Sequence, residues 1–303
     1  MVNNILFLLS QPRSGSTMLQ LILGSNNNIK TSPENSLLLK YLYTYKHDDI
    51  TNFDPIYFNH AHEEFLNLTV SKNINLKIKS LAYEVYSSLC DKKYMYYLDK
   101  SPRYYHILDN LLNTFNDSKF IFLLRNPLAV FNSIIDYHYK DNLSKPFSRY
   151  TCHDLFGCLK KFEIIWNKRD IFNNILFIKY EDLVSDANNV INSIDTFLEL
   201  DTRTKTSYNI NDSILNSSFA DPCAKILNKP NNRSVDKWLL NLVTYQRKNL
   251  FLFYSKFIES LNIVKDNYDI SKNISEINNS KVSLQPYFIR THKSFKNSFQ
   301  FIN

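Results

Sequence analysis

The sequence predicts an α/β protein with a central parallel sheet of about five strands and helices on both faces. The first observation is a set of apolar runs of strand length, at residues 5–9, 94–98, 119–124 and 174–179. The second is that helical patterns separate these runs, as crossovers between parallel strands require. The third is that the first run passes through a glycine turn directly into a helical pattern.

Local signals support each element in chain order. After the strand at 5–9, a helix is expected from Ser16 to Gly24, where the glycine suits a C-terminal cap. A short second strand is expected after residue 26, ending near Glu34. Pro127 lies in the first turn of the helix that follows the strand at 119–124. The remaining helical patterns cover residues 36–45, 76–90, 104–115, 128–139 and 154–172.

Composition limits the class further. The chain has 303 residues, 44% of them hydrophobic, which is enough for one large α/β domain or two small ones. Its four cysteines form no CxxC pair, which indicates reduced thiols in a cytoplasmic protein. The apolar start is too short for a signal peptide or a membrane span, so no membrane partner is expected. The net charge of +7 is spread along the chain, which favours a charged small molecule over nucleic acid as the partner.

Two segments differ from the predicted core. Residues 48–70 are rich in aromatic, His and acidic residues with weak periodicity, and we interpret them as an insertion that roofs a substrate pocket. Beyond residue 265 the chain becomes polar and Asn-rich, but Ile and Phe recur too often for a solvated tail. The predicted organisation is a domain at 1–265 that contains the insertion, with a C-terminal arm at 266–303 packed on it.

The segment from Ser10 to Thr17 contains one of only three glycines in the chain. Between a strand and a helix, such a turn aims backbone N–H groups and the positive end of a helix dipole at one point, where a phosphate can bind. The ATP-binding loop would have a Lys at the position of Ser16, whereas here the cation is Arg13, inside the loop. An ordinary strand-to-helix turn is the alternative interpretation.

A second anion site is expected further along the chain. Arg125 ends the strand at 119–124, and Ser133 follows it by eight residues on the next helix. Eight residues are a little over two helical turns, so Ser133 can face the same groove as Arg125. A guanidinium at the carboxyl end of a strand suits a phosphate. An ATPase would usually have a magnesium-binding Asp there, so Ser16 and Arg125 together argue against an NTP hydrolase.

The two motifs, in this order and at this distance, resemble those of the sulfotransferases that use 3′-phosphoadenosine-5′-phosphosulfate (PAPS). The resemblance covers roughly residues 5–240. It implies a P-loop-like sulfotransferase fold, PAPS as the sulfuryl donor, PAP as its product, and no metal. It also implies that the loop holds the 5′-phosphosulfate and that Arg125 and Ser133 hold the 3′-phosphate. The implied nucleotide-binding residues are Arg13, Ser14, Gly15, Ser16, Thr17, Met18, Arg125, Ser133, Tyr180, Arg233 and Lys237.

Three of these residues come from looser matches. Tyr180 opens a Tyr-Glu-Asp-Leu string that is similar to one frequent in the family, and packing is its alternative role. Arg233 and Lys237 belong to a polar segment before Trp238 that is similar to the family's late loop over the nucleotide. The match is loose because Asp236 stands where the family often has a glycine.

The resemblance also supplies three catalytic residues, Glu34, Arg13 and Lys100. Glu34 follows Arg13 at the interval of the catalytic Glu in the tyrosylprotein sulfotransferase branch, which implies a general base; a helix start is the alternative. Lys100 lies in a Lys-x-Pro string similar to that of the family's catalytic Lys, and with Arg13 it would stabilise the leaving phosphate. Its alternative role is a surface turn. His106 is the alternative general base, because the phenol and steroid sulfotransferases of the family use a His as the base.

These inferences predict an enzyme that moves the sulfuryl group of PAPS to a hydroxyl or amine of a small metabolite or natural product. A protein tyrosine is the alternative acceptor, indicated by the Glu base but not by the cytoplasmic character of the chain. A P-loop small-molecule kinase and an inactive nucleotide-binding fold are the rival functions. His60 and His62 alternate on a polar stretch, which indicates solvent exposure rather than a metal site.

Overall fold

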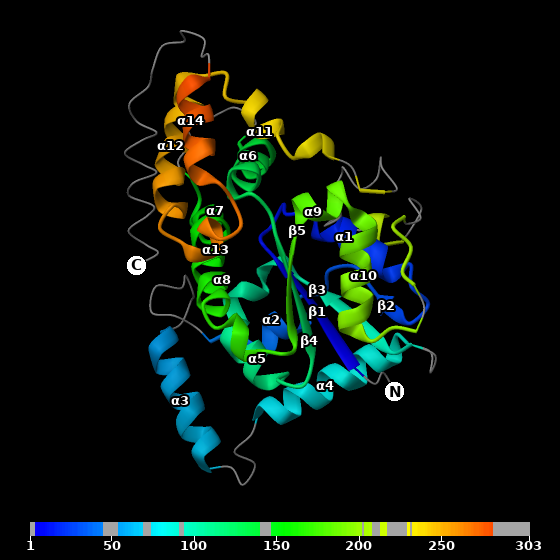
Figure 1. The fold of residues 1–303 in the computed structure, drawn as a ribbon. Helices are drawn as coiled ribbons and strands as arrows, with labels where there is room; N and C mark the ends of the chain where they lie inside the picture. The colour runs from blue at the N-terminus through cyan, green and yellow to red at the C-terminus, as the bar shows by residue number, and fades with distance from the viewer. Residues whose placement is uncertain are drawn as a thin grey trace.

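The structure is a computed structural model, and it describes residues 4–44, 54–68, 74–90, 94–139, 147–201, 203–207, 213–216, 229–230 and 232–280. Its centre is a five-stranded parallel sheet with the strand order β2-β3-β1-β4-β5 (Figure 1). The strands are β1 (Asn4–Ser10), β2 (Ile29–Thr31), β3 (Tyr96–Lys100), β4 (Lys119–Leu124) and β5 (Ile175–Lys179). The predicted fold class is confirmed.

Helices cover both faces of the sheet. One face is covered by α1 (Ser16–Gly24), α9 (Tyr180–Ser185) and α10 (Ala187–Leu198). The other is covered mainly by α4 (Ile74–Ser88), α5 (Leu108–Thr114), α6 (Pro127–His138), α8 (Cys158–Trp166) and α12 (Tyr245–Ile258). The shorter or outlying helices are α2 (Leu37–Leu42), α3 (Pro55–Leu68), α7 (Arg149–Cys152), α11 (Lys237–Leu240), α13 (Asn262–Lys265) and α14 (Ile270–Asn279). The 3-10 turns are η1 (Pro102–Ile107), η3 (Arg169–Ile171), η4 (Ser213–Asn216) and η6 (Asn232–Ser234), and η2 (His153–Gly157) is a π-helical turn.

The apolar run of β1 is explained by burial on both faces. Ile5, Phe7 and Leu9 pack into the core beneath α4, α5 and α8. Leu6 and Leu8 point the opposite way, into the core beneath α1 and α10. Successive side chains of a strand alternate between faces, so a central strand of a parallel sheet must be apolar at every position.

The strand register brings the carboxyl ends of four strands to one edge of the sheet. Leu8 of β1 pairs with Lys100 of β3, and Ser10 pairs with Leu123 of β4. Leu124 of β4 in turn pairs with Lys179 of β5. The segments that follow these strands therefore start side by side. This edge is where open α/β sheets bind their ligands.

Several elements differ in extent from the prediction. β3 continues to Lys100, so that residue belongs to the strand. The helix expected at 104–115 is the 3-10 turn η1 followed by α5. The helix expected at 154–172 starts with the π-helical turn η2, and its continuation α8 ends at Trp166. A π turn releases backbone carbonyls from the usual ladder. Gln11 Nε2 donates to the carbonyls of Asp154 and Leu155 at 3.0 and 3.2 Å, which stabilises this turn.

The predicted insertion at 48–70 contains a regular helix, α3, which its weak periodicity did not indicate. In Figure 1, α3 stands apart from the sheet, and Ile56, Tyr57 and Phe58 on it are exposed. Its role as a roof over a substrate pocket remains a prediction.

The described part of the predicted C-terminal arm includes α14. This helix lies beside α12 in Figure 1, and its Ile270 and Ile277 are buried in the main core. Residues 281–303 lie outside the described residues, and the division of the chain at residue 265 remains a prediction.

Two further features concern the described residues alone. None of their helices combines the length and the apolar character that crossing a bilayer requires. Cys90, Cys152 and Cys158 are free thiols, and Cys223 lies outside the described part of the chain.

Candidate active site

The glycine turn between β1 and α1 has the geometry of an anion-binding loop. Gly15 has φ +89°, and Arg13 has φ +69°, which is uncommon for a residue other than glycine. The helix α1 begins at Ser16, so the first backbone N–H groups of that helix lie next to the turn. The Ser14 hydroxyl is buried and has no hydrogen-bond partner. An unpaired buried donor at a helix start fits the predicted phosphate-binding role.

The structure gives a second reason for the glycine. A Cβ atom built on Gly15 would lie 2.6 Å from Cε2 and 2.7 Å from Cδ2 of Tyr180. Tyr180, the first residue of α9, therefore packs directly on the loop. A side chain at position 15 would collide with the ring of Tyr180. This ring connects the loop to the segment that follows β5.

Glu34 and Lys100 meet beside the loop. Lys100 is the last residue of β3, and its Nζ forms an ion pair with Oε1 of Glu34 in the connection between β2 and α2. Only 2% of the Lys100 side chain and 17% of the Glu34 side chain are exposed. Nζ also lies 3.5 Å from Oγ1 of Thr17 in the first turn of α1. A buried ammonium requires such a partner, because an unpaired charge in the interior is very costly.

Asp99, next to Lys100, faces the other way. Its carboxylate is fully buried and accepts hydrogen bonds from the hydroxyls of Tyr86 at 2.5 Å and Tyr104 at 2.9 Å. Asn35 Nδ2 donates to the same carboxylate at 3.3 Å. Burial raises the pKa of Asp99, and these hydrogen bonds oppose that rise. Asp99 therefore has a structural role in the core and supports the segment that carries Glu34.

Arg13 and Ser133 are also brought together. Nε of Arg13 donates to Oγ of Ser133 at 3.3 Å, from the loop to α6. The Arg13 guanidinium carbon lies 4.9 Å from the ring centroid of Tyr137, one turn further along α6. The loop cation and the predicted 3′-phosphate serine are therefore in direct contact.

Arg125 lies at the centre of the predicted 3′-phosphate site. Its two terminal nitrogens donate to the carbonyl oxygens of Arg13 at 2.9 Å and Ser234 at 2.8 Å. Its guanidinium carbon lies 4.4 Å from the ring centroid of Tyr180, whose hydroxyl is 2.7 Å from Oγ of Ser234. Its Nε is buried without a partner. Since a guanidinium has five N–H groups, Arg125 keeps donors for an anion after these contacts.

The late loop reaches this edge of the sheet through Ser234, which the sequence prediction did not single out. Arg233 lies in η6, and its side chain lies outside the described part of the structure. Lys237 is the first residue of α11 and is exposed. No motif in the sequence marks Ser234, because its contribution comes from a backbone carbonyl and a hydroxyl.

The fallback base His106 lies on η1 among other rings. Its centroid is 4.1 Å from that of Tyr105 and 5.8 Å from that of His153. Nearby, the buried carboxylate of Asp154 accepts from Tyr105 at 2.8 Å and pairs with Arg103 at 3.1 Å. Burial raises the pKa of Asp154, and the charge of Arg103 opposes this. Sequence reasoning missed Asp154, because only the fold brings η2 to η1.

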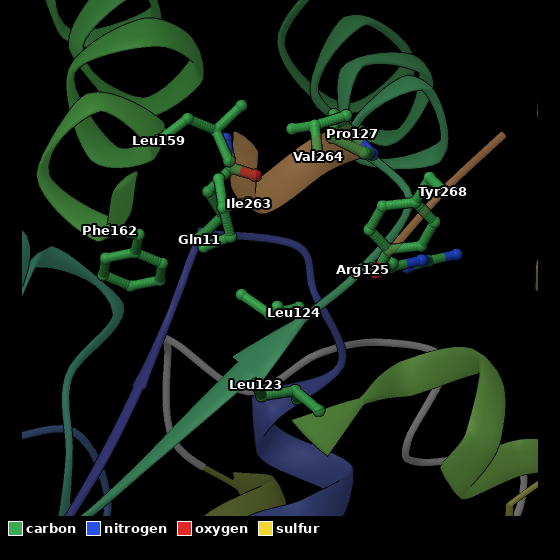
Figure 2. A pocket seen from close by; sticks show the side chains of 10 residues that line it. All are labelled: Gln11, Leu123, Leu124, Arg125, Pro127, Leu159, Phe162, Ile263, Val264 and Tyr268. Atoms are coloured by element: carbon green, nitrogen blue, oxygen red, sulfur yellow. The ribbon is translucent and has the colours of Figure 1, made fainter. Parts of the chain in front are cut away.

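A small cavity of about 10 Å³ lies behind Arg125, between β4 and the segment after α12 (Figure 2). It has room for about one water molecule and none for a nucleotide. A larger groove of about 460 Å³ runs along the edge strand β5 and includes none of the predicted site residues in its lining. Among the described residues, no cluster of three or more His, Cys, Asp or Glu side chains could hold a metal ion.

Comparison with known proteins gives the class. The model of the sulfotransferase family matches residues 6–204, and the chain belongs to this family. The family resemblance and the enzyme class predicted from the loop and Arg125 are thereby confirmed.

A curated relative matches over part of its length. The chain is 30% identical to the nodulation protein NoeE of Sinorhizobium fredii (strain NBRC 101917 / NGR234) over 148 residues, which are 49% of this chain and 34% of that protein. The chain thus spans about a third of the length of this relative.

Two solved structures are similar throughout the fold. The sulfotransferase domain from the curacin biosynthetic pathway has a TM-score of 0.54 at 19% identity, and the match covers 88% of this chain and 99% of that one. The sulfotransferase domain from the Synechococcus PCC 7002 olefin synthase has a TM-score of 0.51 at 24% identity, covering 84% and 95%. At these identities the likeness shows a shared fold.

Proposed function

We propose that the protein is a PAPS-dependent sulfotransferase whose acceptor is a hydroxyl or amine of a small molecule. The observation that carries the proposal is the buried ion pair between Lys100 and Glu34 beside Thr17 of the loop. It sets a cation and a carboxylate next to the turn that suits a 5′-phosphosulfate. Family membership supplies the reaction class.

The residues present fit the nucleotide. Two buried polar atoms without partners, Oγ of Ser14 and Nε of Arg125, lie at the two predicted anion sites. In this proposal, Arg13 and the backbone from Ser14 to Met18 hold the 5′-phosphosulfate. Arg125 and Ser133 hold the 3′-phosphate, with Tyr180, Arg233 and Lys237 as further contacts. PAP, the product, would occupy the same contacts, and no metal enters the proposal.

The bound donor supplies an activated sulfuryl group, and the side chains manage the proton and the charge. Glu34 accepts the proton of the acceptor hydroxyl while the oxygen of that hydroxyl forms a bond to sulfur. The bond between sulfur and the bridging phosphate oxygen breaks, and its electron pair stays on that oxygen. Lys100 and Arg13 stabilise the negative charge that develops there. Because Lys100 pairs with Glu34 before substrates bind, it also fixes the position of the base.

A small-molecule acceptor is supported by the two structural neighbours, which come from the curacin pathway and an olefin synthase. The first of these names states a biosynthetic pathway, and natural-product biosynthesis is part of this proposal. A protein tyrosine remains the alternative acceptor. This alternative is based on the interval between Arg13 and Glu34, which is that of the tyrosylprotein sulfotransferase branch. Cytoplasmic location also remains a prediction.

The kinase alternative gains no support from the site. Asp99, the acidic residue one position before the end of β3, is turned into the core, where the hydroxyls of Tyr86 and Tyr104 donate to it. A kinase would direct such a carboxylate at a nucleotide-bound magnesium ion.

The test is a transfer assay with the purified protein, PAPS carrying labelled sulfate, and pools of small metabolites. We expect labelled products together with stoichiometric PAP, without added magnesium. Transfer of phosphate from ATP would instead support the kinase. Tight PAP binding with no transfer to any pool would support the inactive nucleotide-binding fold.

A further inference from the structure

The segment after α13 reaches back to the predicted 3′-phosphate site. Tyr268 lies beyond the part of the chain matched by the family model. In Figure 2 its ring lies beside Arg125, and both residues border the small cavity behind β4. The hydroxyl of Tyr268 donates to Oε2 of Glu181 at 3.2 Å.

Glu181 connects this tyrosine to the start of α6. Its Oε1 accepts from the backbone N–H of Asn126 at 2.8 Å. Asn126 directly follows Arg125 and caps α6, since its side chain accepts from the N–H of Leu128. A carboxylate at a helix start is stabilised by the free N–H groups and the dipole of that helix. Glu181 therefore fixes the backbone on which Arg125 is mounted.

The environment of the pair is polar but enclosed. Burial raises the pKa of Glu181, and the Asn126 N–H and the charge of Arg125 oppose that rise. Burial together with the charge of Glu181 raises the pKa of Tyr268, so its hydroxyl stays protonated as a donor. Without the Tyr268 hydroxyl, the buried Glu181 carboxylate would lose one of the hydrogen bonds that hold it in a fixed orientation.

Glu181 also neighbours the residue that stacks on Arg125. Tyr180 places its ring 4.4 Å from the Arg125 guanidinium carbon. The first turn of α9 thus supports Arg125 twice: Tyr180 against the guanidinium and Glu181 against the backbone behind it. Tyr268 is the residue that ties this turn to the C-terminal segment.

We infer that Tyr268, acting through Glu181, is a positioning residue that sets Arg125 for recognition of the nucleotide 3′-phosphate. The C-terminal segment then belongs to the nucleotide site and is more than a surface covering. This inference rests on the proposed role of Arg125 as the 3′-phosphate ligand.

The test compares PAP with adenosine 5′-monophosphate (AMP), which lacks the 3′-phosphate, by calorimetric titration of the full-length protein. Wild type is expected to prefer PAP. Tyr268→Phe should lower the ratio of PAP to AMP affinity by about 3–10-fold, the range of one hydrogen bond, while AMP affinity is unchanged. Glu181→Gln, which removes the charge but keeps the size, should also lower the ratio.

The matched control is Tyr254→Phe. Tyr254 is a fully buried tyrosine whose hydroxyl donates to the carbonyl of Leu155 at 3.1 Å, so its loss also removes one interior hydrogen bond. This variant should keep the wild-type preference for PAP. An unchanged ratio in Tyr268→Phe, or an equal fall in both tyrosine variants, would overturn the positioning role. A wild type that binds AMP as tightly as PAP would overturn the role of Arg125 itself, and the inference with it.

Discussion

Lys100 is a buried cation whose charge is balanced by Glu34, and this pairing shapes what a mutation can reveal. Removing the carboxylate leaves an ammonium in the interior without its partner, which costs stability as well as any catalytic function. A fall in melting temperature alone therefore cannot identify the base. Turnover and nucleotide binding have to be measured together.

Glu34→Gln should keep PAP binding and lose about 10²–10⁴-fold in turnover, the range of a positioned general base. Gln has nearly the same size but cannot accept a proton. The measurement is PAP release at saturating PAPS, with calorimetric titration of PAP in parallel. Glu199→Gln is the control, because its ion pair with Lys119 is exposed and away from the loop. Normal turnover of Glu34→Gln together with an inactive His106→Ala would assign the base to His106.

Arg125→Ala should weaken PAP binding by about 10–100-fold, since a hydrogen bond to a charged group contributes ~1.5–3 kcal/mol. Adenosine 5′-phosphosulfate, which lacks the 3′-phosphate, should be affected far less. Calorimetric titration of both nucleotides provides the comparison. Arg169→Ala is the matched control, because Arg169 stacks on Trp166 away from the loop. Equal wild-type affinity for both nucleotides would contradict the assignment.

Gly15→Ala should destabilise the loop for two separable reasons. The positive φ of +89° costs an alanine about 1–2 kcal/mol, and the new Cβ atom meets the Tyr180 ring at 2.6 Å. We expect the thermal shift produced by PAP to disappear. In the Tyr180→Ala background the collision is absent but the strained φ remains, so Gly15→Ala should lower the melting temperature less there than it does in wild type. If PAP still raises the melting temperature of Gly15→Ala as much as that of wild type, the loop is an ordinary turn and does not bind the nucleotide.

At the scale of elements, a polar network joins α6, α12 and the residue after α11 next to the predicted 3′-phosphate serine. Arg247 of α12 donates to Oδ1 of Asp136 at 2.6 Å and to Oδ1 of Asn132 at 2.9 Å, both on α6. Asn241, just after α11, donates to the same two residues. Asn132 precedes Ser133, so this network sets the position of the predicted 3′-phosphate serine relative to the late loop.

Arg247→Met keeps an unbranched apolar stem but removes the charge and the donors of the guanidinium. Because the Asp136 carboxylate then loses a charged partner, the free energy of unfolding should fall by about 1.5–3 kcal/mol. Urea unfolding measures this loss. Lys161→Met, which breaks an exposed ion pair with Asp109, should change stability by less than ~1 kcal/mol. Equal losses in the two variants would contradict the importance of the network.

At the scale of the whole molecule, the pH dependence of stability follows from the carboxyl groups enclosed in the fold. Burial raises the pKa of Asp99 in the folded chain, whereas the unfolded value is about 3.9. The folded state thus binds this proton more tightly than the unfolded state does. Its contribution to stability is fully present below the unfolded pKa and is lost as the pH rises through the folded pKa.

Wild type should therefore lose more stability than Asp99→Asn as the pH is raised from about 4 to 8. Asparagine keeps the size and can accept from Tyr86 and Tyr104, but it carries no titrating proton. Urea unfolding of both proteins across this range gives the difference. Parallel stability profiles would show that Asp99 has the same pKa in the folded and unfolded chains.

The sequence determined the layered fold and the motifs at its ligand-binding edge. A continuous apolar run such as that of β1 indicates a strand buried on both faces of a sheet. A glycine turn before a helix directs backbone N–H groups at an anion through backbone geometry alone. Arg13, Arg125 and Ser133 were identifiable because their positions follow from the ends of strands and from helical spacing. The catalytic roles of Glu34 and Lys100 could be predicted only from the family resemblance, since neither residue lies in a local sequence pattern that indicates a catalytic function.

Tertiary structure alone decided which side chains pair. The ion pair of Lys100 with Glu34, the packing of Tyr180 on Gly15, and the contact of Tyr268 with Glu181 join segments far apart in the chain. No periodicity encodes such contacts, because they depend on the register of the strands and on where each helix docks. The π-helical turn η2 is a further case, since the donors of Gln11 and Tyr254 that stabilise it come from segments far before and far after it in the sequence. Local propensity fixes elements, whereas the partners of buried polar groups are fixed by the packing that encloses them.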